Sequence, residues 1–511
     1  MTDGGALLLG ATGVTATDVV DVARHDLPVH LGHDAVAALE RGAAVVERLV
    51  GQPEPIYGVS TGFGALANTV IPDDRSAELQ TALIRSHAAG MGPEVEREVV
   101  RAMTFLRARS LAMGFSGARP VVVETMLALL NAGVTPVVRE YGSLGASGDL
   151  APLASAALVL LGEGEARLAD GSLVDGVTAL DAAGTPPVTL RAKEGLALIN
   201  GTDGMLGIVV LALADLDVLL RTADIAGAMS TEALLGTDRA FAADLVAMRP
   251  QVGQADSAAN LRALLDGSAI VASHRHGDDR VQDAYSLRCT PQVHGAARDT
   301  VTHARGVAER ELVAFIDNPV VLPDGRVESC GNFHGAPVAA VADFLAISVA
   351  DVGALSERRT DRLLDRTRSH GLPPFLSPDA GVNSGLMIAQ YTQAAMVAEN
   401  RRLAVPASTD TLPTSAMQED HVSLGWSAAR KLRVAVANLA RILAVEIVAA
   451  SWGLELRAPL RPAAGTGAVA RLVIATVGGP GPDAWLAPRL AAVEAMIVDG
   501  SLTTASGLDL V

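Results

Sequence analysis

The sequence predicts a mainly α-helical protein, with an N-terminal domain followed by a central bundle of long helices. Alanine and leucine, which are strong helix formers, dominate the 511 residues, whereas aromatic residues make up only 3% of them. Apolar residues also recur at helical spacing over long stretches, for example at Leu432, Val436 and Leu439. Such sequences form closely packed helices, and apolar residues on more than one helix face indicate packing against other subunits.

The elements can be placed in order along the chain. The apolar residues 7–9 and the glycines at 10 and 13 predict a short strand and turn; a dinucleotide-binding turn is less favoured, because the sequence has no third glycine at the required spacing and no βαβ pattern. Helices are then predicted at residues 17–24, 35–50, 75–89 and within 92–132, with a mobile glycine-rich loop at 51–71 and a glycine–serine turn at 140–149. The later helical patterns cover 204–225, 335–366, 381–404, 424–456 and 484–499.

Composition excludes several classes of function. The net charge of −17 argues against a nucleic-acid partner, because few cations are available to neutralise phosphates. Two cysteines are too few for a disulfide framework and favour a reducing compartment. The N-terminus lacks the basic start of a signal peptide, and Asp215 and Asp217 interrupt the most apolar stretch. These features predict a soluble cytoplasmic protein without a membrane partner.

The most informative segment is residues 142–153, which read Gly-Ser-Leu-Gly-Ala-Ser-Gly-Asp-Leu-Ala-Pro-Leu. If the nitrogen of Gly148 approaches the carbonyl carbon of Ala146, a five-membered ring can close, since small residues tolerate so tight a turn. Loss of water from the ring and of the Ser147 hydroxyl then leaves a conjugated methylene, an electrophile that no ordinary side chain supplies. For three residues alone, the alternative is a polar loop that caps a helix near Asp149.

The full twelve-residue string resembles the signature of the aromatic amino acid ammonia-lyases and aminomutases. Further matches to this family lie at residues 57–64, 198–202, 281–289, 317–319, 331–334, 371–376 and 418–421. The resemblance implies an ammonia-lyase/fumarase-like fold and a 4-methylideneimidazol-5-one group (MIO) formed autocatalytically from Ala146, Ser147 and Gly148, with no external cofactor. It also implies a homotetramer whose active sites take residues from three chains. The expected domains are 1–200, with the prosthetic group and the mobile loop, the helix bundle at 201–480 and a helical tail at 481–511.

Two residues are assigned the main chemical roles by this resemblance. Arg288 would bind the substrate carboxylate through its guanidinium, the alternative being a surface salt bridge. Tyr57 is the candidate base, because it lies among glycines where no core requires an aromatic ring; the alternative is a loop anchor packed on the core. A phenol must have a depressed pKa to act as a base, and Arg288 is a cation that could depress it.

The remaining site residues follow from the same matches. Tyr285 and Asn200 would support the prosthetic group and the substrate amine, with Gln282 as a further polar contact. Phe333 would form a wall beside the substrate. The alternatives are a helix cap for Asn200 and core packing for Phe333.

Two further residues predict the substrate. His87 and Glu419 resemble the histidine-specific branch of the family, because a buried imidazole needs a partner for each ring nitrogen. This branch converts L-histidine to trans-urocanate and ammonia, and Glu419 is also the second candidate base. The rival on the same scaffold is a phenylalanine or tyrosine lyase or an aminomutase. The rival of another class, an inactive helical scaffold, is disfavoured by the presence of Ser147 and Tyr57.

Other sequence features carry less weight. Residues 274–279 contain two histidines and two aspartates, but the spacing fits no closed ligand set, so an exposed loop without a metal is predicted. Cys289 is interpreted as a small buried residue. Cys330, Asp203 and His294 depart from the commonest family pattern and indicate variation within a subgroup.

Overall fold

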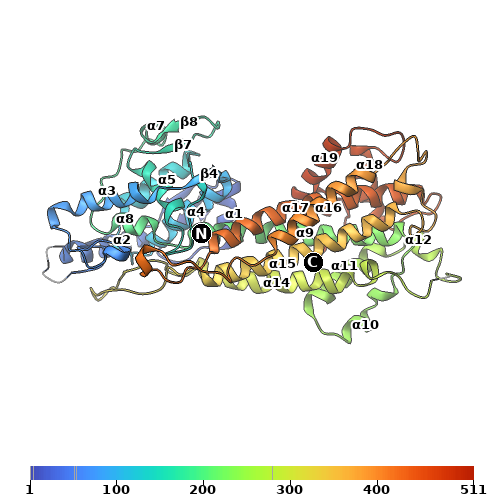
Figure 1. The fold of residues 1–511 in the computed structure, drawn as a ribbon, viewed down its shortest axis with the longest axis horizontal. Helices are drawn as coiled ribbons and strands as arrows, with labels where there is room; N and C mark the ends of the chain where they lie inside the picture. The colour runs from blue at the N-terminus through green and yellow to red at the C-terminus, as the bar shows by residue number, and fades with distance from the viewer. Residues whose placement is uncertain (1, 4, 51, 53–54, 279) are drawn as a thin grey trace. The chain divides into compact units, whose positions relative to one another are not determined.

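The computed structural model describes residues 2–3, 5–50, 52, 55–278 and 280–511 (Figure 1). Gly51 and residues 53–54 of the predicted 51–71 loop lie outside the described residues, as does Asp279 of the 274–279 segment. Helices account for most of the described chain, and the strands are short. The predicted mainly α class is therefore confirmed.

The chain forms two compact units, each built from three stretches. Unit 1 comprises Met1–Leu211, Arg305–Ala342 and Pro406–Arg430, and unit 2 comprises Ala212–Ala304, Asp343–Val405 and Lys431–Val511. Four of the five boundaries fall inside long helices: α9 (Asp203–Ala233), α14 (Thr290–Leu312), α15 (Ala336–Leu364) and α17 (Gly425–Leu456). The fifth, between Val405 and Pro406, follows a helix that ends at Leu403. The three-part domain division expected from the sequence stays a prediction.

Unit 1 is built around a buried helix, α4. Besides its share of the four long helices, unit 1 also contains α1 (Ala16–Arg24), α2 (His33–Leu49), α3 (Ser76–His87), α5 (Pro120–Asn131), α6 (Leu150–Leu160), α7 (Gly176–Ala182) and α8 (Glu194–Ile199). Every residue of α4 (Arg97–Ala112) from Val99 onward is buried, and the helix packs against α1, α2, α5, α6 and α8. Arg107 on this helix donates to the carbonyls of Asn200 and Ile316, each at 2.8 Å. A charged residue in the core thus fixes the backbone of two loops of the site.

Small sheets border these helices. β2 (Ala6–Leu9) pairs antiparallel with β1 (Thr2–Asp3) and parallel with β3 (Val29–Leu31), with Leu7 opposite Val29. The other strands are β4 (Met91–Glu94) with β6 (Arg139–Tyr141), β7 (Glu165–Arg167) between β5 (Thr135–Pro136) and β8 (Leu173–Asp175), and β9 (Val320–Val321) with β10 (Val327–Glu328). The predicted strand and turn at residues 7–13 correspond to β2. The pair β4–β6 leads directly into the 142–153 segment.

Unit 2 is built from helices in its described part. Besides its share of the four long helices, it contains α10 (Ala243–Ala247), α11 (Val252–Leu265), α12 (Ala269–Ala272), α13 (Tyr285–Arg288), α16 (Met387–Leu403), α18 (Ala464–Val477), α19 (Ala487–Val498) and α20 (Ser501–Ala505). α15 and α17 are joined by a buried ion pair, in which Arg359 Nε lies 2.5 Å from Glu446 Oε1. Both partners are fully buried, so this contact fixes the register of the two helices.

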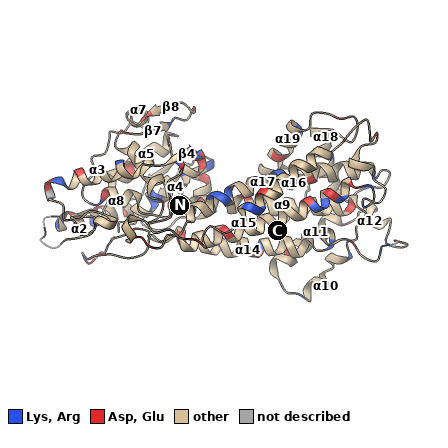
Figure 2. Cartoon of the chain, viewed as in Figure 1, with Lys and Arg blue, Asp and Glu red and all other residues tan. Residues whose placement is uncertain are grey.

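Two of the long helices, α15 and α17, are long and apolar enough to cross a membrane by length and composition. Their most apolar windows are 56% and 83% buried within the structure. Core helices of soluble proteins share these properties, so they are weak evidence for a membrane span. In the view of Figure 2, Lys and Arg are interspersed with Asp and Glu over the helices of both units.

Candidate functional site

The 142–153 segment forms a tight turn in unit 1. Ser147 has φ 52° and Gly148 φ 83°, and Gly145 and Gly148 form an isolated antiparallel bridge. Ser143 Oγ accepts a hydrogen bond from the Gly145 nitrogen at 3.1 Å and braces the turn from inside. A Cβ added at residue 148 would overlap the Gly201 carbonyl, so only glycine fits there. The positive φ of Ser147 shows that the backbone is held in an uncommon conformation at this point.

Asp149, which follows the turn, is fully buried. Its Oδ1 accepts from Ser143 Oγ at 2.9 Å, its Oδ2 accepts from the Met205 nitrogen at 2.8 Å, and its own nitrogen donates to the Gly201 carbonyl at 2.7 Å. Burial raises the pKa of this carboxyl to about 7, although the hydrogen bonds act in the opposite direction. Asp149 is the N-cap residue of α6, but its side chain makes no capping hydrogen bond to that helix. Its carboxylate instead accepts from the first turn of α9, so the helix-capping alternative holds in part.

This pKa predicts a pH-dependent stability that an asparagine would lack. The folded-state pKa lies above the ordinary value of 3.8, so the folded protein binds the Asp149 proton more tightly than the unfolded chain does. The resulting stabilisation is present below pH 3.8 and is lost as the pH rises towards 7. We expect the stability of the wild type relative to Asp149→Asn to fall with rising pH, by at most about 1.4 kcal/mol per pH unit.

Thermal unfolding of both proteins at pH 5, 6, 7 and 8 measures this difference directly. A difference that stays constant over this range would show that Asp149 is ionised throughout.

Asn200 lies beside the turn, at the C-terminal end of α8. Its Nδ2 donates to Asp317 Oδ1 at 3.1 Å and to the Asn318 carbonyl at 2.7 Å. Asp317 in turn accepts from Lys193 Nζ at 2.7 Å. The position of Asn200 at the end of a helix agrees with the helix-cap alternative, but its amide is bonded to another loop.

Tyr57 is partly buried in the glycine-rich loop. Its hydroxyl accepts from the Gly64 nitrogen at 3.3 Å, and its ring meets Phe63 edge to face at 6.3 Å. Burial raises the pKa of the phenol, and the negative charges of Glu419 and Asp317 raise it further. A phenol that acts as a base needs a depressed pKa, whereas the surroundings of Tyr57 in unit 1 raise it.

His87 ends α3 with one ring nitrogen engaged. Its Nδ1 lies 2.9 Å from the Leu83 carbonyl and 3.0 Å from Ser86 Oγ. A carbonyl can only accept, so Nδ1 carries the proton and Nε2 is an acceptor when the ring is neutral. Burial lowers the pKa of His87, against the opposing charge of Glu419, and this favours the neutral ring.

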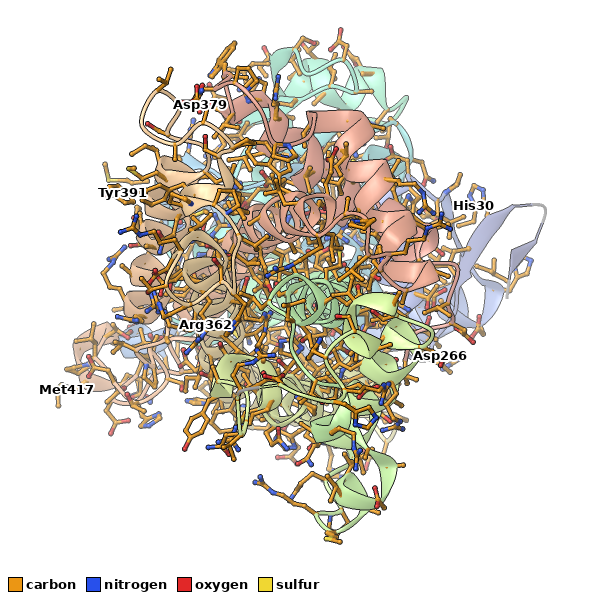
Figure 3. The ribbon with its side chains drawn as sticks, turned by 90° about the vertical axis from the view of Figure 1, so that its right-hand side faces the viewer. His30, Asp266, Arg362, Asp379, Tyr391 and Met417 are labelled. Carbon is orange, nitrogen blue, oxygen red and sulfur yellow. The ribbon has the colours of Figure 1, made fainter. Side chains whose placement is uncertain are left out.

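Glu419 is held in a turn that contacts the Tyr57 loop. Thr414 Oγ1 donates to Glu419 Oε2 at 2.8 Å, and the backbones of the two residues pair with each other. Ser415 Oγ accepts from the Ala65 nitrogen at 2.9 Å and so joins this turn to the glycine-rich loop. Met417, at the tip, is 68% exposed (Figure 3). Gly64, which bonds to the Tyr57 hydroxyl, also lies beside Glu419 Oε1, so Tyr57 and Glu419 share one region. The negative charge of Glu419 acts on His87 as well.

Phe333 is partly exposed in a turn next to the same segment. The neighbouring His334 and His421 have ring centroids 5.3 Å apart, and His421 Nδ1 lies 3.3 Å from His334 Nε2. Leu424 donates its N–H to the Leu144 carbonyl at 2.9 Å, which ties the 418–424 segment to the tight turn. Unit 1 therefore brings together the turn, Tyr57, His87, Asn200, Glu419 and the Phe333 segment.

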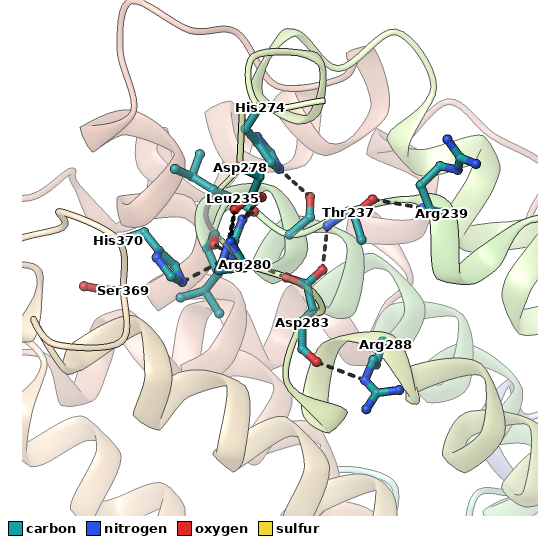
Figure 4. Close-up of polar contacts among 12 residues, drawn as sticks. Leu235, Thr237, Arg239, His274, Asp278, Arg280, Asp283, Arg288, Ser369 and His370 are labelled. Atoms are coloured by element: carbon teal, nitrogen blue, oxygen red, sulfur yellow. Dashed lines mark hydrogen bonds and ion pairs between the residues drawn. The ribbon is translucent and has the colours of Figure 1, made fainter. Parts of the chain in front are cut away.

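Three predicted site residues lie on unit 2. Gln282 and Tyr285 are exposed, Tyr285 to 71%, and Arg288 is partly buried at the end of α13. The Arg288 guanidinium lies 4.6 Å from the centre of the Tyr285 ring, within the range of a cation–π contact. Arg288 Nε donates to the Asp283 carbonyl at 2.9 Å (Figure 4). No carboxylate is paired with Arg288 among the described residues, so the surface salt-bridge alternative finds no support there.

Arg280 and Asp283 hold this segment in place. Arg280 pairs with Asp278 at 2.7 Å and with Asp283 at 3.3 Å, and it donates to the carbonyls of Leu234 and Leu235. Figure 4 shows Asp283 between Arg280, the Thr237 nitrogen and Arg288. This network was not predicted from the sequence. It borders a hollow of about 410 Å³ in unit 2, lined in part by Gln282, Tyr285, Arg288, Arg362, Arg368 and His370.

Some of the other features noted in the sequence contact these clusters: the Cys330 nitrogen donates to Asn318 Oδ1 at 2.7 Å, and its Sγ lies 3.4 Å from the Asp317 carbonyl. Cys289 and Cys330 are free thiols and are partly buried, so the expectation that Cys289 is buried is wrong. Cys289 follows α13, a short helix with both buried and exposed residues. His274 bonds to the carbonyls of Ile270 and Gly236. Among the described residues there is no group of three or more His, Cys, Asp and Glu side chains that could hold a metal ion.

Comparison with known proteins shows to which family the chain belongs. Residues 14–475 match the family model described as aromatic amino acid lyase. The chain belongs to the aromatic amino acid lyase family. This lyase is 61% identical over 501 residues to the histidine ammonia-lyase of Streptomyces avermitilis, and the match covers 98% of each chain.

Solved structures agree with this assignment. The tyrosine aminomutase of Streptomyces globisporus has a TM-score of 0.93 and 36% identity, covering 99% of this lyase and all of that chain. The histidine ammonia-lyase of Trypanosoma cruzi has a TM-score of 0.90 and 38% identity, covering 98% and 95% of the two chains. The ammonia-lyase fold expected from the sequence is therefore confirmed.

Proposed function

We propose that this lyase removes ammonia from L-histidine and releases trans-urocanate. The observation that carries the proposal is the pair His87 and Glu419 in unit 1, where the neutral imidazole offers Nε2 as an acceptor and the carboxylate acts electrostatically on it. Two acceptors fit the two N–H groups of a substrate imidazolium, whereas a phenyl ring offers neither. The name of the 61% identical relative supports the same substrate.

The direct test is an assay for the conjugated product. Purified protein is given L-histidine, L-phenylalanine or L-tyrosine, and the absorbance of the unsaturated acid and the ammonia released are both followed. Release of urocanate and ammonia from histidine supports the proposal. Formation of a β-amino acid without free ammonia would identify an aminomutase on the same scaffold.

We also propose that Ala146, Ser147 and Gly148 form the MIO group. Support comes from the tight turn, the positive φ of residues 147 and 148 and the absence of room for a side chain at residue 148. When formed, the group supplies an electrophile that makes the substrate amine a better leaving group. Asp149 and Ser143 would hold the turn in the conformation that ring closure needs.

Other side chains of the protein would bind the substrate and remove its β-proton. Arg288 would bind the carboxylate, and Tyr285, Gln282 and Phe333 would line the space beside the substrate. Tyr57 would take the β-proton, with Glu419 as the alternative base. Since Glu419 and Asp317 raise the pKa of the phenol, we expect the positive charges of the bound ammonium and of Arg288 to offset them.

Removing the Tyr57 hydroxyl is expected to affect turnover rather than binding. Loss of a positioned general base typically costs 10²–10⁴-fold in rate, so Tyr57→Phe should reduce kcat by about that factor. The affinity for imidazole-4-propionate, which cannot react, should change little. Tyr391→Phe is the matched control, because Tyr391 on α16 is 61% exposed and points outward (Figure 3). Near-normal turnover of Tyr57→Phe would assign the base elsewhere, with Glu419 next.

We further propose a cytoplasmic homotetramer with active sites shared between chains. Exposed apolar side chains support subunit packing: on α15 Phe344 is 47% and Ile347 46% exposed, and on α16 Ile388 is 58% exposed.

A further inference from the structure

Lys193 and Asp317 form an ion pair that is entirely buried inside unit 1. Lys193 Nζ lies 2.7 Å from Asp317 Oδ2, and both side chains are 0% exposed. Removing two charges from water is unfavourable, and proteins with apolar replacements of such pairs are often as stable. The pair therefore calls for a role other than general stability, and its second contact supplies one.

That second contact fixes the amide of Asn200. Nδ2 of Asn200 donates to Asp317 Oδ1 and to the Asn318 carbonyl, so both of its hydrogens are used. A flipped amide would place the Asn200 oxygen against a carboxylate and a carbonyl, both acceptors. The orientation with Oδ1 turned away from Asp317 is thus the only one that the surroundings allow.

The Asn200 oxygen is left without a partner. Oδ1 is buried and accepts no hydrogen bond within the described chain. A buried acceptor without a partner destabilises the protein, and a bound donor would remove this penalty. The next residue, Gly201, lies against Gly148 and accepts from the Asp149 nitrogen, while the Asp317 charge acts on Tyr57. The unpaired oxygen therefore belongs to the loop that lines the proposed reaction centre.

We propose that Lys193 and Asp317 are positioning residues, which hold Asn200 so that its Oδ1 accepts a hydrogen bond from the substrate ammonium. An ammonium group suits this place, because it brings three donors and a positive charge to a region with the carboxylates of Glu419 and Asp317. Lys193 compensates the charge of Asp317 and engages its Oδ2, while Oδ1 accepts from Asn200 Nδ2 and from the Asn318 nitrogen. The inference rests on the proposed function, since it requires an amino acid substrate with an imidazole ring.

Two ligands that differ only in the amine test the inference. Ser147→Ala serves as the parent, because L-histidine should bind to it without reacting, and imidazole-4-propionate is the same molecule without the amino group. In Asp317→Asn, the new amide should turn its oxygen to Lys193 and its NH₂ to Asn200, which displaces the Asn200 amide. Calorimetry should then show about a tenfold loss of L-histidine affinity, equivalent to about 1.4 kcal/mol, with the affinity for imidazole-4-propionate unchanged.

A second variant separates positioning from folding. With Lys193→Met added to Asp317→Asn, residue 317 is free to turn its amide oxygen back to Asn200, so the affinity for L-histidine should recover to within about threefold of the parent. The matched control is Glu446→Gln, which makes the same change in the buried Arg359–Glu446 pair of unit 2. It should lower the melting temperature without separating the two ligands.

The outcomes distinguish the two proposals. A loss of affinity confined to the amine-bearing ligand in Asp317→Asn, and recovered in the double variant, supports the positioning role. Equal effects on both ligands, or no recovery, would overturn it while leaving the proposed function intact. If the Ser147→Ala parent binds neither ligand, the proposed function itself is wrong, and the positioning inference falls with it.

Discussion

Ser147→Ala should leave a folded protein whose turnover is reduced by about four orders of magnitude or more, because no side chain replaces the lost electrophile. Each tenfold loss of rate corresponds to about 1.4 kcal/mol of activation free energy. The fold should survive, since the turn is braced by Ser143, Gly145 and Asp149, and these contacts do not involve the Ser147 hydroxyl. The substitution removes the one oxygen whose loss is needed to create the methylene.

Intact mass gives a readout that does not depend on activity. The wild type should be lighter than its sequence by two water molecules, whereas Ser147→Ala cannot lose the hydroxyl and cannot show the full difference. Ser155→Ala is the control, because Ser155 lies only two turns further along on α6 and bonds to its own helix at Ala151. An active wild type with unmodified mass would exclude the prosthetic group altogether.

Most of the helices could be predicted from the spacing of apolar residues, and the helices that were missed or predicted too short share a physical cause. The helices expected at 335–366, 424–456 and 484–499 correspond to α15, α17 and α19 within a few residues. The expected 204–225 helix continues to Ala233, because buried Thr222, Asp224 and Glu232 break the apolar pattern without breaking the helix. α14 was not predicted for the same reason, since its sequence is largely charged and polar.

Site residues that belong to short motifs could be predicted from the sequence. Residues whose role depends on contacts between distant segments could not. Asp149 was visible only as a possible helix cap, whereas its burial and the raised pKa depend on α9, which starts more than fifty residues later. Lys193 carries no motif at all, and its link to Asp317 spans 124 residues. The pKa of Tyr57 could not be predicted, because the sequence does not show that Glu419 and Asp317 lie beside it.

Substrate choice should depend on two acceptors that L-phenylalanine would leave unpaired. His87 presents Nε2, because Nδ1 is engaged at Leu83, and Glu419 keeps one carboxylate oxygen beyond the Oε2 that Thr414 holds. A site built to bond a polar ring rejects an analogue without the polar groups by roughly 10⁴-fold or more. We therefore expect kcat/KM for phenylalanine to be lower than for histidine by about this factor, and tyrosine to be little better.

Variants at His87 and Glu419 should reduce the difference in kcat/KM between histidine and phenylalanine, mainly by lowering the activity on histidine. Glu419→Gln keeps the shape but loses the charge that attracts an imidazolium, so histidine turnover should fall strongly while any residual phenylalanine turnover falls less. His87→Phe should lower histidine affinity and relieve the penalty that phenylalanine meets at Nε2. The measurement is product formation from each amino acid at matched concentration for the wild type and both variants. If Glu419→Gln lowered both activities equally, Glu419 would be acting on the reaction itself rather than on recognition of the ring, and equal wild-type turnover of phenylalanine would place this lyase in another branch of the family.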